Sequence, residues 1–192
     1  LCLRVAGRAQ QPQALSLAGL PAGWEVATAM PLAPGGGPLD FLAADYDELV
    51  DHPVELGRFW RGSFEARGVP HEFVVAGALP SFDGERLLAD AKRVCEAQIA
   101  FWHGRRKPHF DRYVFLLNAV EEGYGGLEHR ASTALIANRR DLPRRGIAAQ
   151  GEGYTTLLGL ISHEYFHTWN VKRLRPAFFF NDTATTEIYT EL

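Results

Sequence analysis

Hydrophobic and polar positions change their spacing along the chain, and this divides it into a β-rich beginning and a mixed remainder. In residues 1–40, Pro and Gly separate short apolar runs at 1–5, 14–17 and 24–29. Runs of this length between turn-forming residues are typical of strands. The Pro- and Gly-rich stretch at 34–38 indicates a domain boundary, so we expect one domain to cover residues 1–40 and the next to begin at 41.

The second domain is predicted to begin with a loop, a hairpin and a helix. Residues 45–51 are acidic and loop-like, and two β-prone runs within 59–77 flank a turn at 68–70. From 84 to 102, apolar residues recur at three- and four-residue steps, which predicts a helix with one buried face. Asp83 is suited to cap the start of this helix, and Gly104 is suited to end it.

Two more strands and a second helix complete the predicted elements. Residues 113–119 form a strongly apolar run of strand length, which we expect to be central in a sheet, and residues 131–137 form another. Thr155 or Thr156 can cap a helix that runs through Val171. Strands and helices in this order predict an α+β fold.

Composition narrows the class of protein. The chain has 192 residues and a formal net charge of −3, which gives no reason to expect a nucleic-acid partner. It has no apolar run of the roughly 18 residues that a membrane span needs. Cys2 and Cys95 are far apart, so a disulfide framework is not expected, and Cys95 falls on the apolar face of the first helix. Low cysteine content favours the cytoplasm, while a periplasmic or secreted location stays open because we expect the segment that would hold a signal peptide to be missing from this sequence.

The run His-Glu-Tyr-Phe-His at residues 163–167 is the strongest chemical signal in the sequence. Four helical residues turn about 400°, so His163 and His167 leave the same face and can reach one zinc ion. Glu164 is rotated by about 100°, which suits it to accept a proton from a water molecule and not to bind the metal. The run is short and does occur by chance, but two histidines on an otherwise apolar helix need partners, and zinc supplies one.

A second candidate motif, Gly-Tyr-Gly-Gly-Leu-Glu-His, lies upstream at residues 123–129. Gly125 and Gly126 would let an edge strand approach a peptide substrate closely. Glu128 would project from that strand toward the zinc helix, where its carboxylate could bind the α-ammonium group of a substrate. Taken alone, the motif is weak evidence, because a Gly-rich turn with an exposed glutamate is the more common explanation.

The two motifs together, about thirty residues apart, closely resemble the glycyl aminopeptidase family of zinc metallopeptidases. The acidic stretch at 45–51 and the run at 98–104 also resemble that family, and the similarity covers roughly residues 1–177. The resemblance implies the end of an N-terminal β-rich domain, followed at 41–177 by the first half of a thermolysin-like zinc peptidase domain. It also implies that His163 and His167 bind one zinc ion, that Glu164 is the general base, and that Glu128 binds the substrate amine beside Gly125 and Gly126.

Residues 178–192 depart from the family pattern. They resemble a translated sequencing adapter, so we expect a non-native tail and a chain cut inside the catalytic domain. The family's third zinc ligand is a glutamate on a following helix. Glu187 has a suitable spacing from His167 but the wrong neighbours, so we expect the third protein ligand to be missing from this chain.

Three functional hypotheses follow from these motifs. The first is a zinc-dependent aminopeptidase that removes small, glycine-like residues from peptides, with this chain alone inactive. The second is a catalytically inactive peptide-binding module that uses the same cleft. The third is a structural protein in which the pair His163 and His167 is incidental. Peptides are the expected partners in the first two, and the sequence does not indicate an oligomeric state.

Overall fold

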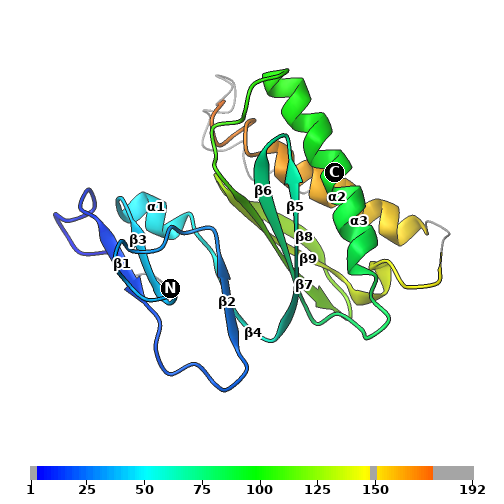
Figure 1. The fold of residues 1–192 in the computed structure, drawn as a ribbon, viewed down its shortest axis with the longest axis horizontal. Coiled ribbons are helices and arrows are strands. Elements are labelled where there is room, and N and C mark those ends of the chain that lie inside the picture. The colour runs from blue at the N-terminus through cyan, green and yellow to red at the C-terminus, as the bar shows by residue number, and fades with distance from the viewer. Residues whose placement is uncertain (1–3, 148–150, 175–192) are drawn as a thin grey trace, which may run out of the picture.

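The computed structural model describes residues 4–147 and 151–174, and these form an α+β structure as predicted (Figure 1). A β-rich N-terminal part precedes a five-stranded sheet that carries two long helices on one face. Cys2, Glu187 and the tail expected at 178–192 lie outside the described residues. No helix in the described ranges is long and apolar enough to cross a membrane.

The N-terminal part contains two small antiparallel sheets. In the first, β1 (Gln13–Ser16) pairs with β3 (Asp40–Ala43), and in the second, β2 (Glu25–Thr28) pairs with β4 (Val54–Gly57). This pairing crosses the expected boundary between residues 40 and 41, because strands on both sides of it belong to the same sheets. The boundary at 40/41 stays a prediction, and the five-stranded sheet begins at Phe59.

The prediction of a loop at 45–51 was wrong, because this stretch contains the helix α1 (Tyr46–Val50). The Asp45 carboxylate accepts a hydrogen bond from the Glu48 backbone N–H at 2.8 Å, which satisfies one of the free donors at the helix start. Asp47 and Glu48 lie in the first turn, where negative charge is favourable. The acidic residues that suggested a loop therefore stabilise the start of a short helix.

The five-stranded sheet has the order β5-β6-β7-β9-β8. Its strands are β5 (Phe59–Ala66), β6 (Val69–Ala76), β7 (Tyr113–Val120), β8 (Tyr124–Glu128) and β9 (Ser132–Asn138). β6, β7 and β9 run parallel, whereas the edge strands β5 and β8 run antiparallel to their neighbours. β7 is central and buried, as predicted, and β8 is the edge strand on which the second motif lies.

The predicted hairpin at 59–77 is confirmed, although its turn is shorter than expected. The turn consists of Arg67 and Gly68, whose φ angles are 51° and 77°, while Val69 and Pro70 already belong to β6. Two consecutive positive φ angles give the tight turn whose twist matches that of the adjoining strands.

The helix α2 (Gly84–His103) agrees with its prediction at both ends. The Asp83 side chain accepts a hydrogen bond from the Arg86 backbone N–H at 3.1 Å, and Gly104 follows the last turn with a φ of 61°. Cys95 is fully buried on the inner face, as expected. α2 packs beside α3 on the same face of the sheet (Figure 1), and the main hydrophobic core lies between these helices and the strands.

The helix α3 (Glu152–Phe166) carries the zinc motif but begins and ends earlier than predicted. Its cap is Gly151, and the Thr155 hydroxyl donates to the Gly151 carbonyl oxygen from inside the helix. The helix ends at Phe166, not at Val171, whose φ of 104° is incompatible with a right-handed helix. The chain therefore turns back directly after His167, and this turn contributes to the site.

Candidate metal and substrate site

His163 and His167 lie one turn apart at the end of α3 and direct their ring nitrogens toward a common point. Their Nε2 atoms are 3.0 Å apart. The Nδ1 of His167 lies 3.0 Å from the carbonyl oxygen of Asn170, and since a carbonyl can only accept, Nδ1 carries the proton. In the neutral ring, the Nε2 lone pair is then free to bind a metal, which is the usual arrangement of a ligating histidine.

This pair fits a zinc ion in its geometry and donor type. Two nitrogens on a tetrahedral zinc, each about 2.0–2.1 Å away, stand roughly 3.3 Å apart, close to the separation of the two Nε2 atoms. The described ranges contain no group of three or more His, Cys, Asp or Glu residues that could hold a metal ion. If they hold a metal ion, the two histidines would therefore be a partial ligand set within the described part of the chain.

Glu164 is buried beside the histidine pair, with only 5% of its surface exposed. Among the residues that the structure describes, its Oε2 has no hydrogen-bond partner, which is costly for a carboxylate unless a water or a substrate group completes the site. Burial raises the pKa of Glu164, His167 and His129 lower it, and the nearby Glu128 carboxylate raises it further. The result is a more basic carboxylate, which suits a group that accepts a proton near neutral pH.

The edge strand β8 passes directly over Glu164. A Cβ atom built on Gly126 would stand 2.4 Å from Cδ of Glu164 and 2.6 Å from its Oε1, so a side chain at this position would force the Glu164 carboxylate or the strand to move. At Gly125, with φ of 155°, an added Cβ would meet nothing within 4 Å. Of the two predicted glycines, Gly126 thus allows the close approach of β8 to α3, and Gly125 has a backbone conformation that other residues rarely adopt.

Glu128 ends β8 on the same side as the zinc motif. Its negative charge acts on both His163 and Glu164, raising the pKa of each, although burial and the charge of His167 lower the pKa of His163 overall. The Thr133 hydroxyl, on β9, donates to the Leu127 carbonyl oxygen at 3.1 Å and holds the strand just before Glu128. The structure therefore brings all the predicted site residues of β8 and α3 into one region.

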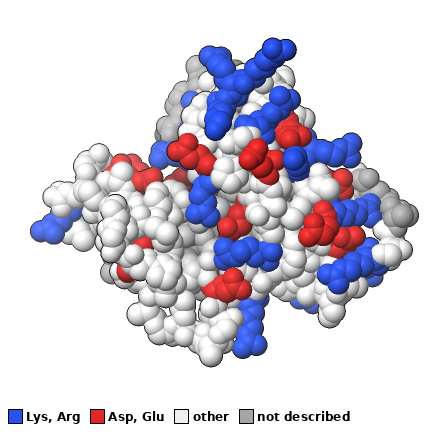
Figure 2. All heavy atoms as spheres, in the orientation of Figure 1, with Lys and Arg blue, Asp and Glu red and all other residues white. Residues whose placement is uncertain are grey.

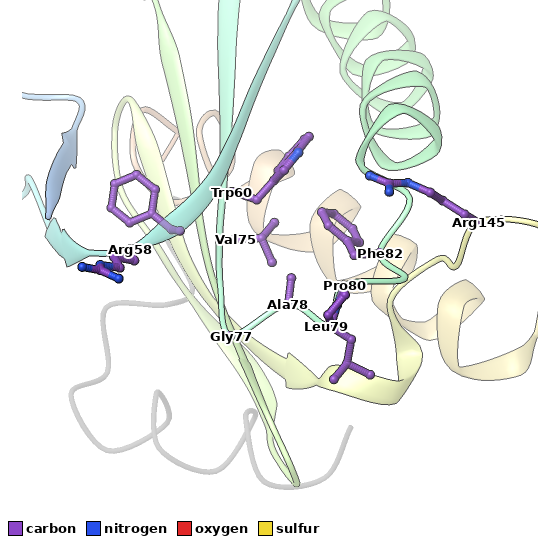
Figure 3. Close-up of a pocket in the computed structure, with 10 residues that line it drawn as sticks. Arg58, Trp60, Val75, Gly77, Ala78, Leu79, Pro80, Phe82 and Arg145 are labelled. Carbon is purple, nitrogen blue, oxygen red and sulfur yellow. The ribbon is translucent and has the colours of Figure 1, made fainter. Parts of the chain in front are cut away.

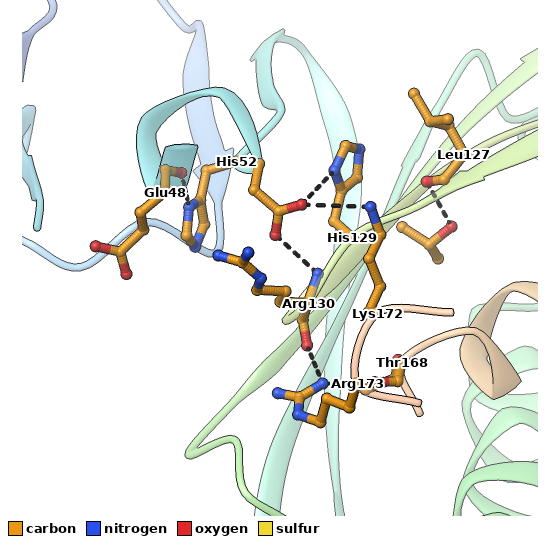
Figure 4. A network of polar contacts seen from close by, with 10 residues as sticks. Glu48, His52, Leu127, His129, Arg130, Thr168, Lys172 and Arg173 are labelled. Atoms are coloured by element: carbon orange, nitrogen blue, oxygen red, sulfur yellow. Dashed lines mark hydrogen bonds and ion pairs between the residues drawn. The ribbon is translucent and has the colours of Figure 1, made fainter. Parts of the chain in front are cut away.

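Sequence reasoning did not identify the polar residues that support this region. Asn170 orients His167 through its backbone. Asp51, directly after α1, contacts the segments that follow β8 and α3. Figure 4 shows its partners Arg130 and Lys172 close together. The family-like acidic stretch already included Asp51, but its partners lie about 80 and 120 residues away in the chain, so no local pattern could reveal them.

A shallow pocket lies elsewhere, beside the start of β5 and the loop that precedes α2 (Figure 3). It has a volume of about 390 Å³, and its lining includes Arg58, Trp60, Phe82 and Arg145. None of the predicted site residues takes part in it. Lys and Arg side chains are interspersed with Asp and Glu over the face seen in Figure 2. Neither the pocket nor the surface charge marks a different site, so the candidate site is the region formed by α3 and β8.

Known families and structures match the chain at both ends and over most of its length. The family described as Peptidase M61 N-terminal domain matches residues 1–58, and M61 glycyl aminopeptidase matches residues 156–192. An aminopeptidase N family protein from Idiomarina loihiensis is 39% identical, with a TM-score of 0.85 over 94% of this chain. The chain belongs to the M61 peptidase family.

The M61 chain spans 31% of the length of the Idiomarina protein. An M1 zinc metallopeptidase from Deinococcus radiodurans aligns with a TM-score of 0.43 and 15% identity, over 78% of this chain and 32% of that one. No curated protein matches the chain. The M61 match at 156–192 contains the zinc motif and continues across the residues that we expect to be non-native.

Proposed function

We propose that this chain forms part of a zinc-dependent aminopeptidase that removes small, glycine-like residues from the amino end of peptides. The observation that carries the proposal is the convergence of the His163 and His167 nitrogens beside Glu164, a buried carboxylate with an unpartnered oxygen. Membership of a family described as glycyl aminopeptidase supports both the reaction and the preference for small residues.

Each residue of the site has a distinct role in this proposal. His163 and His167 hold the zinc ion, which, when bound, lowers the pKa of a water molecule and polarises the scissile carbonyl. Glu164 accepts the proton of the attacking water and passes it to the leaving amine. Burial beneath β8 favours this role, since it makes the carboxylate more basic and excludes other water.

Glu128 fixes which peptide bond is cleaved. A substrate that pairs with the open edge of β8 would bring its α-ammonium group toward the Glu128 carboxylate. Such a charge-assisted hydrogen bond contributes about 1.5–3 kcal/mol. The distance from Glu128 to the zinc ligands then sets how far the cleaved bond lies from the chain end.

We further propose that residues 1–192 alone are inactive. A catalytic zinc site needs three protein ligands and one open position, and the described residues supply two histidines. Two ligands bind zinc weakly, so activity requires a third one. The following experiments therefore use a full-length M61 enzyme that carries residues 1–177 of this chain.

The proposal is tested with a free and an N-acetylated glycyl peptide. Wild type should cleave the free peptide and should cleave the acetylated one poorly, because the acetylated amine has no charge. Glu128→Ala should lower kcat/KM for the free peptide by about 10- to 100-fold and change the acetylated reaction little. Glu122→Ala, which removes an exposed carboxylate just before β8, is the matched control and should behave as wild type.

Equal losses on both peptides would assign Glu128 a structural role only. Efficient cleavage of the acetylated peptide by wild type would identify an endopeptidase instead. Stoichiometric peptide binding without zinc or turnover would support the alternative, an inactive peptide-binding module.

A further inference from the structure

Asp51 connects three segments that are distant in the sequence. It follows α1 in the N-terminal part, and its side chain is only 12% exposed. Oδ2 accepts a hydrogen bond from the Arg130 backbone N–H at 2.9 Å. Oδ1 lies 3.6 Å from Nδ1 of His129 and 3.5 Å from Nζ of Lys172 (Figure 4). One carboxylate thus contacts the end of β8 and the turn after α3.

The partners of Asp51 are the immediate neighbours of site residues. His129 and Arg130 directly follow Glu128, so the two contacts to them fix the backbone where β8 ends. Lys172 lies in the turn after α3, and its backbone N–H donates to the His167 carbonyl oxygen at 3.2 Å. Movement of Asp51 would therefore displace the Glu128 carboxylate with respect to the zinc ligands.

The Asp51 carboxylate is charged under all ordinary conditions. Burial by itself would raise its pKa, but the contact with His129, the hydrogen bond from the Arg130 N–H and the charge of Lys172 lower the pKa to about 2. Ion pairs that are largely shielded from water hold a fixed geometry better than exposed pairs do. Within the described part of the chain, the acidic side chains of α1 itself make no contacts of this kind, and Asp47 is exposed.

We propose that Asp51 is a positioning residue for Glu128, through which the N-terminal part of the chain takes part in recognising the amino end of the substrate. The inference rests on the proposed role of Glu128. Asp51 touches neither zinc nor substrate and acts by holding the residues that follow Glu128. Small displacements of a substrate-positioning group are sufficient to lower rates by one to two orders of magnitude.

A double-mutant cycle between Asp51 and Glu128 tests this inference. In the full-length enzyme, Asp51→Asn should lower kcat/KM about tenfold for the free glycyl peptide, mainly through KM, and less than about twofold for the acetylated one. In the Glu128→Ala background, Asp51→Asn should add less than about a twofold further loss, because the group that it positions is gone. Asp47→Asn, the same change four residues earlier on α1, should leave kcat/KM for both peptides unchanged.

The outcomes separate the inference from the proposed function. A tenfold loss from Asp51→Asn that persists in the Glu128→Ala background, or that is equal on both peptides, would show general destabilisation and overturn the inference. The inference would also be overturned if Asp51→Asn discriminated between the free and the acetylated peptide as strongly as wild type does. If Glu128→Ala alone leaves selectivity unchanged, the proposed function itself fails.

If Asp51→Asn fails to fold, which zinc content and circular dichroism would reveal, a second variant tests the inference instead. Asp51→Glu keeps the charge but moves the carboxylate by one methylene. It should give a smaller loss on the free peptide, which again disappears in the Glu128→Ala background. Additive losses in this second cycle would equally overturn the inference.

Discussion

Gly126 of β8 lies directly against the carboxylate of Glu164, so that a Cβ atom on Gly126 would stand 2.4 Å from the Glu164 Cδ atom. This distance is shorter than any ordinary contact between carbon atoms. The edge strand and the side chain of the proposed general base are therefore in close contact, so a shift of either one would move the other. Gly126, on the proposed substrate-binding strand, thus makes room for the proposed general base.

Gly126→Ala should consequently damage catalysis in the full-length enzyme. Either β8 moves away from α3 or Glu164 leaves its position, and both changes separate the base from the substrate. We expect kcat to fall at least about tenfold, with zinc content unchanged, because the three atoms nearest an added Cβ all belong to Glu164. Steady-state kinetics together with metal analysis measure both quantities.

Gly159→Ala is the matched control for this prediction. Gly159 lies on α3, the helix of Glu164, and an added Cβ would meet nothing within 4 Å. Alanine is favoured over glycine in helices by about 0.8–1.0 kcal/mol, so this variant should be more stable and fully active. If Gly126→Ala retained normal turnover, the close contact between β8 and Glu164 would not exist in the working enzyme.

Glu164→Gln separates proton transfer from metal binding. Glutamine has nearly the same size but cannot accept the proton, so we expect kcat to fall by about 10²–10⁴-fold with zinc bound as in wild type. Glu152→Gln makes the same change at the start of the same helix and should leave kcat unaltered. Near-normal turnover in Glu164→Gln would remove Glu164 from the mechanism.

Much of this architecture follows from local patterns in the sequence. The Asp83 cap, the apolar face that contains Cys95 and the apolar run of β7 each depend on neighbouring residues, and their predictions are confirmed. The separation of His163 and His167 fixes their common direction as soon as the segment is helical.

The sequence-based predictions were wrong or incomplete where tertiary contacts or small conformational differences determine the local structure. Residues 45–51 form a helix because the Asp45 side chain caps it, although the same acidic composition also suits a loop. Helix α3 ends at Phe166 because the chain turns back on itself with Val171 at a φ of 104°. The contacts of Asp51 with His129 and Lys172 join distant segments and have no counterpart in any sequence spacing.

The expected non-native tail can be tested by truncation. If residues 178–192 supply no ligand, a chain that ends at Ala177 should bind zinc as weakly as the 192-residue chain. Isothermal titration with Zn²⁺ compares the two, with His167→Ala as the control that removes a proposed ligand. Loss of affinity on truncation, reproduced by Glu187→Gln, would identify Glu187 as the third ligand and agree with the M61 match that extends to residue 192.

His71 should make the fold sensitive to mild acid. It is 1% exposed beneath α3, its Nδ1–H donates to the Val69 carbonyl oxygen, and its Nε2 accepts from the Tyr165 hydroxyl at 2.9 Å. Burial lowers the pKa of His71 from 6.5 to about 4. The unfolded chain therefore takes up a proton between these values while the folded chain does not, so stability falls as the pH decreases from about 6.5 to 4.

The size of this effect can be isolated by substitution. A difference of this size in pKa corresponds to a loss of at most about 3 kcal/mol in the free energy of unfolding. His71→Gln keeps a donor and an acceptor but has no charge to gain. We expect it to be less stable than wild type at pH 7.5, because it loses the stacking of His71 on Phe64, yet to lose less stability on acidification. Urea denaturation at pH 7.5, 6 and 5 gives the change of the free energy of unfolding with pH for wild type and for His71→Gln. Equal changes in the two proteins would show that His71 is protonated as readily in the folded chain as in the unfolded one.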